Sequence, residues 1–264
     1  MITDTSAIVL KTIPFSESSL IVTLLSEMHG KMAVMARGAR RNKNKFGGLL
    51  QPGAILDVSY YFKSTRDVQN LSDVTQKMAT WRIHQNMEKM AIGMVTLELC
   101  EQMSHEYEPM PDMSAFLTGF LAWLHETESN PRFLFPYIQF RLAHIAGIGI
   151  TLYLPENATG PEEISARSHT GHMVNEPQNE FTCYLNVESG SITEKADSGL
   201  CFGLTKSQSK YLRYIADGKN SLLLKADFPV SDIKHLIHHL DAYLQFHLEG
   251  IRGRRSDAIF EQIL

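Results

Sequence analysis

The sequence predicts an α+β protein in which a small β-barrel precedes a larger helical body. Short runs of β-branched and aromatic residues, separated by turn residues, fill about the first 77 positions. From about Thr80 the apolar residues recur at a spacing close to 3.6, which is typical of helices. The charge divides at the same point. Residues 1–80 carry ten Lys or Arg and six Asp or Glu, a net +4, and because the whole chain of 264 residues is net −4, the remainder is net −8.

Five strands are expected in the N-terminal domain, which we place at residues 1–78. Their ranges are 7–12, 20–25, 31–36, 55–62 and 68–74. Five short strands in about 75 residues match a Greek-key barrel of the OB-fold type, whose closure removes open sheet edges. The spacing alone also fits an SH3-like barrel, so that alternative stays open.

The remaining residues, 79–264, are expected to form a helical domain. Apolar periodicity predicts helices over 81–103, 115–126, 132–146, 206–216 and 232–248. Ser114 and Ser231 are the expected N-caps of two of these helices, and Pro131 suits the first turn of a third. An irregular insert, at about 150–204, interrupts the domain and contains one candidate strand at 181–187.

The sequence gives no indication of membrane insertion or export. No apolar run approaches the roughly 18 residues of a membrane span, and the N-terminus lacks the basic and apolar regions of a secretory signal. The three cysteines, Cys100, Cys183 and Cys201, form no CxxC pair. Sparse cysteines suit a reducing compartment better than a disulfide framework, so we expect a cytoplasmic protein.

The strongest functional signal is a basic loop between the third and fourth expected strands. No acidic residue lies between Glu27 and Asp57, and five cations fall within nine residues of this gap: Arg37, Arg40, Arg41, Lys43 and Lys45. Charges packed this densely repel one another and favour a polyanion that neutralises them. A solvated loop without a ligand is the simpler interpretation. The position on a five-stranded barrel favours nucleic acid, because OB barrels commonly bind single strands along a basic face.

Aromatic and further basic residues extend this surface. Tyr60, Tyr61 and Phe62 are consecutive on one expected strand, so either Tyr61 or the other two face outward. An outward aromatic ring is a platform on which bases stack, and Tyr61 is our candidate. The full set of candidate DNA-binding residues is Lys31, Arg37, Arg40, Arg41, Lys43, Lys45, Tyr61, Lys63 and Arg66.

Two groups of residues have the composition of metal ligands. One group lies on the last expected helix: His235, His238, His239 and Asp241. Neighbouring histidines on a helix point about 100° apart, so helix-surface histidines are the simpler interpretation. The other group lies in the insert: His169, His172, Cys183 and Cys201. Its cysteines are eighteen residues apart, which does not match the close pairs of zinc modules.

No enzyme motif is present. The sequence lacks the glycine-rich phosphate loops, the nucleophile elbow and the zinc-protease motif by which common enzymes are recognised. We therefore expect a protein without enzymatic activity, cofactor or bound metal.

The residues of the first domain resemble those of the RecO family, the bacterial recombination mediators. The resemblance rests on the segments 8–12, 16–17, 29–31, 36–41, 46–52 and 60–62. It is dense over residues 1–75 and thinner beyond, where the Phe140-Arg141-Leu142 stretch followed by Gly147, and the final helix with residues 250–256, are similar. Many members carry a four-cysteine zinc module after this glycine. This chain keeps only Cys183 and Cys201 there, which implies a zinc-free insert.

The resemblance implies a nucleoid-associated mediator of DNA repair and recombination. Such a protein would bind single- and double-stranded DNA, anneal strands and help to load recombinase onto DNA coated by single-strand-binding protein (SSB). Its implied partners are RecR and the acidic C-terminal tail of SSB. A tail that ends in an apolar residue and a carboxylate needs an apolar pocket with a cation at its rim, ideally Arg. Arg141 is our first candidate for that cation, and Arg132 is the second.

Two other functions stay open at this point. The barrel could serve as a protein-interaction adaptor whose basic loop holds an acidic partner. A metal-dependent hydrolase that uses His235, His238, His239 and Asp241 is the less favoured alternative.

Overall fold

A closed five-stranded barrel forms the N-terminal part of the molecule. The computed structural model describes residues 1–153 and 181–264. The barrel strands are β1 (Ile2–Phe15), β2 (Ser19–Ser26), β3 (Gly30–Ala36), β4 (Ile55–Tyr61) and β5 (Val68–Met78). They follow one another around the barrel in the order β1-β2-β3-β5-β4, and only the β3–β5 pair is parallel. This connectivity is that of the OB-fold and excludes the SH3-like alternative.

β1 is longer than the sequence predicts and pairs with two neighbouring strands. It pairs with β4 over residues 2–8 and with β2 over residues 7–15, and its register shifts between Val9 and Lys11. Such an irregularity bends a strand, which allows β1 to pass from one side of the barrel to the other. Pro14, which predicts a turn, lies instead on the second half of β1, where β1 no longer pairs with β4. A missing N–H is tolerated at such an edge.

The long β3–β4 connection closes one end of the barrel. Its apolar residues Phe46 and Leu50 are buried in the barrel core with side chains from every strand. The Asn44 side chain accepts a 2.9 Å hydrogen bond from the backbone N–H of Phe46, which fixes the turn that inserts the ring. The basic residues that precede Phe46 are therefore held on a folded plug.

The helical body contains α1 (Met87–Met103), α2 (Pro111–Glu126), α3 (Phe135–Ile145), α4 (Lys206–Ala216), α5 (Val230–His247) and α6 (Asp257–Ile263). Short 3-10 turns precede α1 and α3 and follow α4: η1 (Trp81–Gln85), η2 (Arg132–Leu134) and η3 (Asn220–Leu222). α4 has the predicted bounds and begins with a capping box at Thr205. α6, which is only seven residues long, was not predicted.

Four of the five predicted helix starts were wrong. The helix expected over 132–146 begins at Phe135, after the 3-10 turn η2, so Pro136 and not Pro131 lies in its first turn. The helix expected over 81–103 is broken at Asn86, whose extended backbone and side chain cap α1 through a 2.8 Å bond to the Lys89 N–H. Ser114 lies within α2, because Pro111 already begins that helix. Ser231 lies within α5, which starts at Val230.

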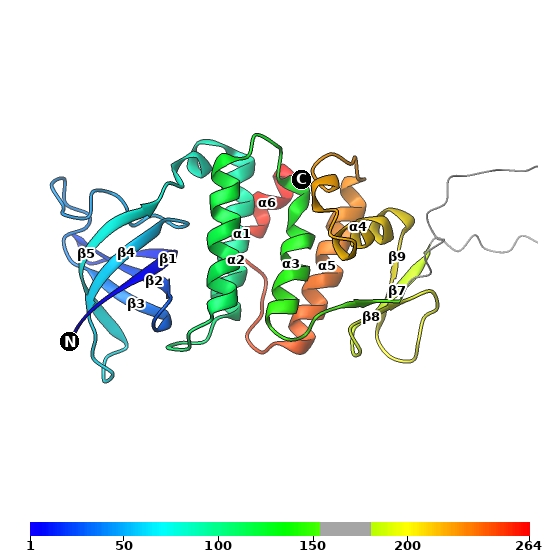
Figure 1. Cartoon of the computed structure of the whole chain (residues 1–264), viewed down its shortest axis with the longest axis horizontal. Helices are drawn as coiled ribbons and strands as arrows, with labels where there is room; N and C mark the ends of the chain where they lie inside the picture. Colours follow the sequence, from blue (N-terminus) through cyan, green and yellow to red (C-terminus); the bar gives the residue numbers. More distant parts are fainter. Residues whose placement is uncertain (154–180) are drawn as a thin grey trace, which may run out of the picture.

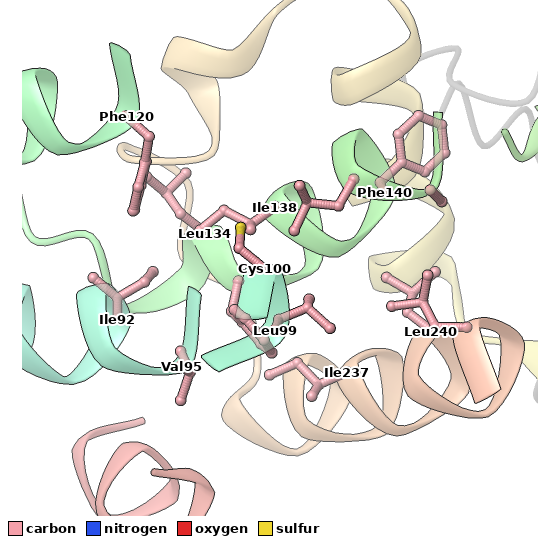
Figure 2. Close-up of a cluster of buried hydrophobic side chains, with 14 of the residues drawn as sticks. Ile92, Val95, Leu99, Cys100, Phe120, Leu134, Ile138, Phe140, Ile237 and Leu240 are labelled. Carbon is pink, nitrogen blue, oxygen red and sulfur yellow. The ribbon is translucent and has the colours of Figure 1, made fainter. Parts of the chain in front are cut away.

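One continuous apolar core joins the helices to the barrel. Side chains from α1, α2, α3 and α5 point toward one another in this core, and Figure 2 shows ten of them labelled, from Ile92 on α1 to Leu240 on α5. Barrel residues Ile8, Leu10 and Ile55 belong to the same cluster. The barrel is therefore packed against the helical body rather than tethered to it.

A small sheet forms in the described part of the region that was expected to be an irregular insert. Its strands β6 (Thr151–Leu152), β7 (Cys183–Asn186), β8 (Ser191–Thr193) and β9 (Cys201–Leu204) are arranged in the order β6-β8-β7-β9. The predicted strand at 181–187 corresponds to β7, and the others are too short to leave a pattern. Figure 1 shows an elongated molecule with the barrel at one end, the helices in the middle and this sheet near the other end. Within the described ranges, no helix is long and apolar enough to cross a bilayer.

Candidate nucleic-acid interface

The basic loop lies directly after β3 and is docked on the β1–β2 turn. Arg37, Arg40, Arg41, Lys43 and Lys45 are all exposed. Arg40 donates twice across this contact, from its backbone N–H to the Ser18 carbonyl and from Nη1 to the Ser16 carbonyl, both at 3.0 Å. Gly38 has a φ of 75°, a left-handed conformation that favours glycine, and it allows the loop to fold back. The loop thus presents its cations from a defined backbone.

The charges of this loop are available to a ligand. None of the ion pairs in the described part of the chain involves these five cations. Lys45 is the most engaged of them: its ammonium group donates to the Ser72 carbonyl and lies 5.2 Å from the centre of the Phe46 ring. Arg40 keeps its bond to the Ser16 carbonyl, and Arg37, Arg41 and Lys43 are exposed; within the described residues none of these four has a carboxylate partner. A polyanion could therefore neutralise them without breaking existing salt bridges.

A partly exposed apolar row borders the basic loop, and its members Ile21 and Met35 are half-buried. Ile13, Ile21 and Met35 lie opposite one another across β1, β2 and β3. Ile13 is 45% exposed, and Phe15, two residues further along β1, is 48% exposed beside the turn that holds Arg40. Sequence reasoning missed this row because it ended the first strand before Pro14. The alternation of Ile13 and Phe15 across that proline was the available signal.

The opposite face of the barrel is acidic. Asp4, Ser59 and Asp73 face one another across β1, β4 and β5, and Asp57 lies two residues from Ser59 on the same face. Tyr61 is 46% exposed and projects from this face of β4 as well. The structure therefore places Tyr61 at the end of this acidic face and away from the Arg37–Lys45 loop, with Ile2 and Asn70 as its cross-strand neighbours. A polyanion would meet repulsion there.

Tyr60 and Phe62 face the other way from Tyr61 and contact His29. The Tyr60 hydroxyl lies 2.5 Å from His29 Nδ1, and the Phe62 ring stacks on His29 with 4.1 Å between ring centres. Burial lowers the pKa of His29 and raises the pKa of Tyr60, so both groups are held uncharged at neutral pH. The sequence left open whether Tyr61 or the pair Tyr60 and Phe62 faces outward, and in the structure Tyr61 faces outward.

The β4–β5 loop forms a second basic element. Lys63 and Arg66 are exposed on this loop. It follows Phe62, near the β2–β3 turn that carries His29, whereas the Arg37–Lys45 loop contacts the β1–β2 turn. The two basic elements therefore project from different ends of the barrel, which Figure 1 also shows.

Lys31 is not part of either basic loop. Its ammonium group donates a 3.0 Å hydrogen bond to the Glu101 carbonyl near the end of α1. Its backbone carbonyl accepts from the Tyr107 N–H at 2.9 Å. Lys31 thus joins the barrel to the helical body, which is a structural contact.

The helical body has an apolar pocket beside the two candidate tail-binding residues. The pocket has a volume of about 510 Å³ and is lined mainly by Phe116, Phe120, Trp123, Leu134, Tyr137 and Leu224. Arg141 is exposed, forms no ion pair within the described ranges and lies one helical turn beyond Tyr137 on the same face of α3. The Arg132 guanidinium lies 4.5 Å from the Phe133 ring centre, next to Leu134. An apolar pocket and nearby free cations are therefore present together.

Two of the four residues proposed for a metal-dependent hydrolase are otherwise engaged, and His235 and His238 are exposed on the surface of α5. Asp241 forms an ion pair with Arg254, and the His239 ring stacks on Phe202 with 4.5 Å between ring centres. Burial, with smaller contributions from His235 and His238, lowers the pKa of His239 to about 4. Across residues 1–153 and 181–264, no group of three or more potential ligands could hold a metal ion. This removes the geometric basis of the hydrolase alternative.

The two cysteines of the insert cannot share one metal ion. In the β7–β9 ladder Cys183 pairs with Leu204 and Cys201 pairs with Asn186, so the cysteines are three residue pairs apart and face opposite sides of the sheet. Cys183 is buried, and burial raises the pKa of its thiol. His169 and His172 lie outside the described residues. The expectation of a zinc-free insert therefore stays a prediction.

Comparisons with known proteins identify relatives of the whole chain. A family model described as "Recombination protein O N terminal" matches residues 1–78. A DNA repair protein RecO from Salinibacter ruber is 37% identical over 147 residues, a match that spans 56% of each chain. A RecO from Chlorobium limicola is 26% identical over 266 residues, covering 100% of this chain and 99% of its own length. One from Chloroherpeton thalassium is 25% identical with full coverage of both chains. With the matching barrel and full-length relatives, the chain belongs to the RecO family of DNA repair proteins.

Proposed function

We propose that this chain is a non-enzymatic, DNA-binding recombination mediator. Its family supports a role in DNA repair and recombination. In this proposal the protein binds single- and double-stranded DNA, anneals strands and helps to load recombinase onto SSB-coated single strands. The observation that carries it is the exposed loop whose five cations form no ion pair with the residues that the structure describes, next to an apolar row on the OB barrel.

The basic loop would bind phosphates and the barrel face would accept bases. Arg37, Arg40, Arg41 and Lys43 can neutralise successive backbone charges, which releases the counterions condensed on the nucleic acid. The Ile13–Ile21–Met35 row and Phe15 offer an uncharged surface for unpaired bases, on the strands by which OB-folds bind oligonucleotides. Phosphate contacts carry no sequence information, so sequence preference should be weak.

The same charges would favour annealing. Two complementary strands repel each other through their phosphates before they pair. A surface that neutralises part of this charge lowers the repulsion. The two basic loops at different ends of the barrel give such a surface more than one place to hold a strand.

The apolar pocket of the helical body would bind the SSB tail. Phe116, Trp123 and Tyr137 would contact the apolar residue that ends the tail. Arg141, with Arg132 as the second candidate, would pair with its free carboxylate. The partnership with RecR rests on the family resemblance alone, and we assign it no surface.

A salt titration of DNA binding tests the proposal. The full chain is titrated with a fluorescent single-stranded oligonucleotide over a range of salt concentrations, as wild type and with Arg37, Arg40, Arg41 and Lys43 all changed to Ala. If about four phosphates lose their contacts, the slope of log affinity against log salt should flatten by about 3. The matched control replaces four exposed lysines of the helical body and small sheet with Ala: Lys195, Lys206, Lys210 and Lys225.

Two outcomes would count against the proposal. An unchanged slope in the folded loop variant would place the DNA site elsewhere. An absence of DNA binding by the wild type at low salt would favour the adaptor alternative, in which the loop holds an acidic protein.

A further inference from the structure

The β4–β5 loop is held from inside the barrel by one buried side chain. Gln69 is fully buried at the start of β5. Its Oε1 accepts a 2.8 Å hydrogen bond from the Lys63 N–H, and its Nε2 lies 3.0 Å from the Lys63 carbonyl and 2.7 Å from the Arg66 carbonyl. These bonds fix the inner side of the loop backbone and leave both cationic side chains free to extend outward.

A residue of the helical body holds the same loop from outside. The Tyr107 hydroxyl lies 3.0 Å from the Arg66 carbonyl and 3.1 Å from the Asp67 carbonyl, to which it donates. It also accepts from Gln69 Nε2 at 3.3 Å. Its ring meets the edge of the Phe62 ring, with 6.3 Å between centres. The loop backbone is thus enclosed between Gln69 and Tyr107.

Tyr107 is itself fixed in position. It lies in the connection between α1 and α2 with a φ of 58°, a left-handed conformation that non-glycine residues rarely adopt. Its N–H donates to the Lys31 carbonyl, and a Cβ added at neighbouring Gly30 would lie 1.8 Å from the Glu108 carbonyl oxygen. The connection is therefore packed tightly on the start of β3. A strained residue persists only where its surroundings hold it, which the contacts with β3 do here.

From these contacts we infer that Tyr107 is a positioning residue for nucleic-acid binding: it holds the β4–β5 loop in the conformation that presents Lys63 and Arg66 to phosphates. The inference rests on the proposed function, in which these cations contact DNA. It assigns a role in DNA binding to a residue that lies outside the loop carrying the cations and belongs to another part of the fold. Side chains on a fixed loop lose less conformational freedom on binding than side chains on a mobile one, so fixing the loop strengthens binding.

The test removes only the hydroxyl group. Tyr107→Phe in the full chain keeps the ring and its contact with Phe62 but loses the bonds to Arg66, Asp67 and Gln69. With an oligothymidine probe, we expect binding about five-fold weaker than wild type, the effect of one hydrogen bond. The salt slope should also flatten by about 1, because two phosphate contacts become less occupied. Tyr214→Phe is the matched control, since the Tyr214 hydroxyl forms no hydrogen bond in the described part of the chain.

A second variant background tests whether the effect of Tyr107 on DNA binding depends on Lys63 and Arg66. In a chain with Lys63→Ala and Arg66→Ala, which should itself bind DNA more weakly, the added Tyr107→Phe change should have no further effect. Equal losses in both backgrounds would overturn the inference, as would wild-type binding by Tyr107→Phe or by the Lys63/Arg66 variant. Failure of the proposed function looks different, since it appears as an unchanged salt slope in the Arg37, Arg40, Arg41 and Lys43 variant.

Discussion

The guanidinium of Arg254 forms a bidentate ion pair with Asp241, at 2.7 Å from Nη1 to Oδ1 and 2.6 Å from Nη2 to Oδ2. Its Nε donates to Asp257 at 2.8 Å, and its plane lies 4.7 Å from the Phe135 ring centre. The Arg254 side chain is only 2% exposed. From the sequence alone, Asp241 is a candidate ligand of the metal-site alternative, and the cluster of Arg252, Arg254 and Arg255 is expected to be a second DNA contact. Burial of Arg254 makes that expectation wrong for this residue. The structure unites Asp241 and Arg254 in one element that joins α5 to α6.

Arg254 should therefore matter for stability and not for DNA binding. Arg254→Met leaves two carboxylates without their shared cation, and removing one partner of a buried pair typically costs about 3–5 kcal/mol. Urea unfolding should show this loss, whereas exposed Arg252→Met should change stability by less than about 0.5 kcal/mol. A stability loss confined to Arg252→Met, or a folded Arg254→Met with weakened DNA binding, would contradict the structural role.

Much of the barrel could be predicted because its signals are local. Alternating apolar residues and turn glycines mark each strand, and the strand order then follows from a small set of barrel topologies. The residues at which the strands end were less predictable. β1 continues past Pro14 because β4 has left that edge, and no local pattern shows where a neighbouring strand ends.

The basic loop was also predictable, because five cations in nine residues are visible in composition. The structural role of Lys31 was not predictable, because the Glu101 carbonyl that accepts a hydrogen bond from its ammonium group lies 70 positions away in the sequence. The sequence also could not show that Tyr61 lies on the same barrel face as Asp4, Asp57 and Asp73, because this depends on the register of β1, β4 and β5. Seven-residue α6 carries too few apolar positions to show a period, and its Phe260 is buried only through contact with Phe135 and other helices.

His239 should make the protein less stable in acid. Burial lowers its pKa from 6.5 to about 4, so the folded state keeps this ring neutral where the unfolded chain already binds a proton. The stabilising contribution is fully present above pH 6.5 and is lost as the pH falls toward 4. His239→Phe keeps a ring to stack on Phe202 and removes the titrating group.

The measurement is the free energy of unfolding between pH 4 and 8. The His239→Phe variant should lose less stability than wild type between pH 6.5 and 4. At pH 8 it should be as stable or more stable, because the buried Nδ1 of His239 has no hydrogen-bond partner among the described residues. Exposed His84→Gln is the control. Parallel curves for wild type and His239→Phe would show that another group controls the acid response.

The apolar pocket should contribute more to tail binding than the arginine beside it. Arg141 is exposed in the free protein, so its pairing with a carboxylate is screened, and Arg141→Ala should weaken binding of an SSB tail peptide by about 1 kcal/mol. Trp123→Ala removes an aromatic wall of the pocket and should cost about 2 kcal/mol or more. Fluorescence titration with the peptide measures both, with Lys225→Ala as the control. Wild-type affinity in both variants would exclude this pocket.

Phe15 should distinguish single from double strands. Its exposed ring stands beside the turn that Arg40 contacts, so an unpaired base could stack on it while its phosphate meets the basic loop. Base stacking on an aromatic ring contributes roughly 1–3 kcal/mol, so Phe15→Ala should weaken single-strand binding by about five-fold or more. Bases in a duplex are already stacked, which leaves double-strand binding nearly unchanged. Phe15→Trp should restore single-strand affinity, and Tyr61→Ala, on the acidic face, should have little effect. Competition between single- and double-stranded probes of the same sequence measures the ratio directly, and an equal loss on both probes would mean that Phe15 supports the β1–β2 turn and does not contact bases.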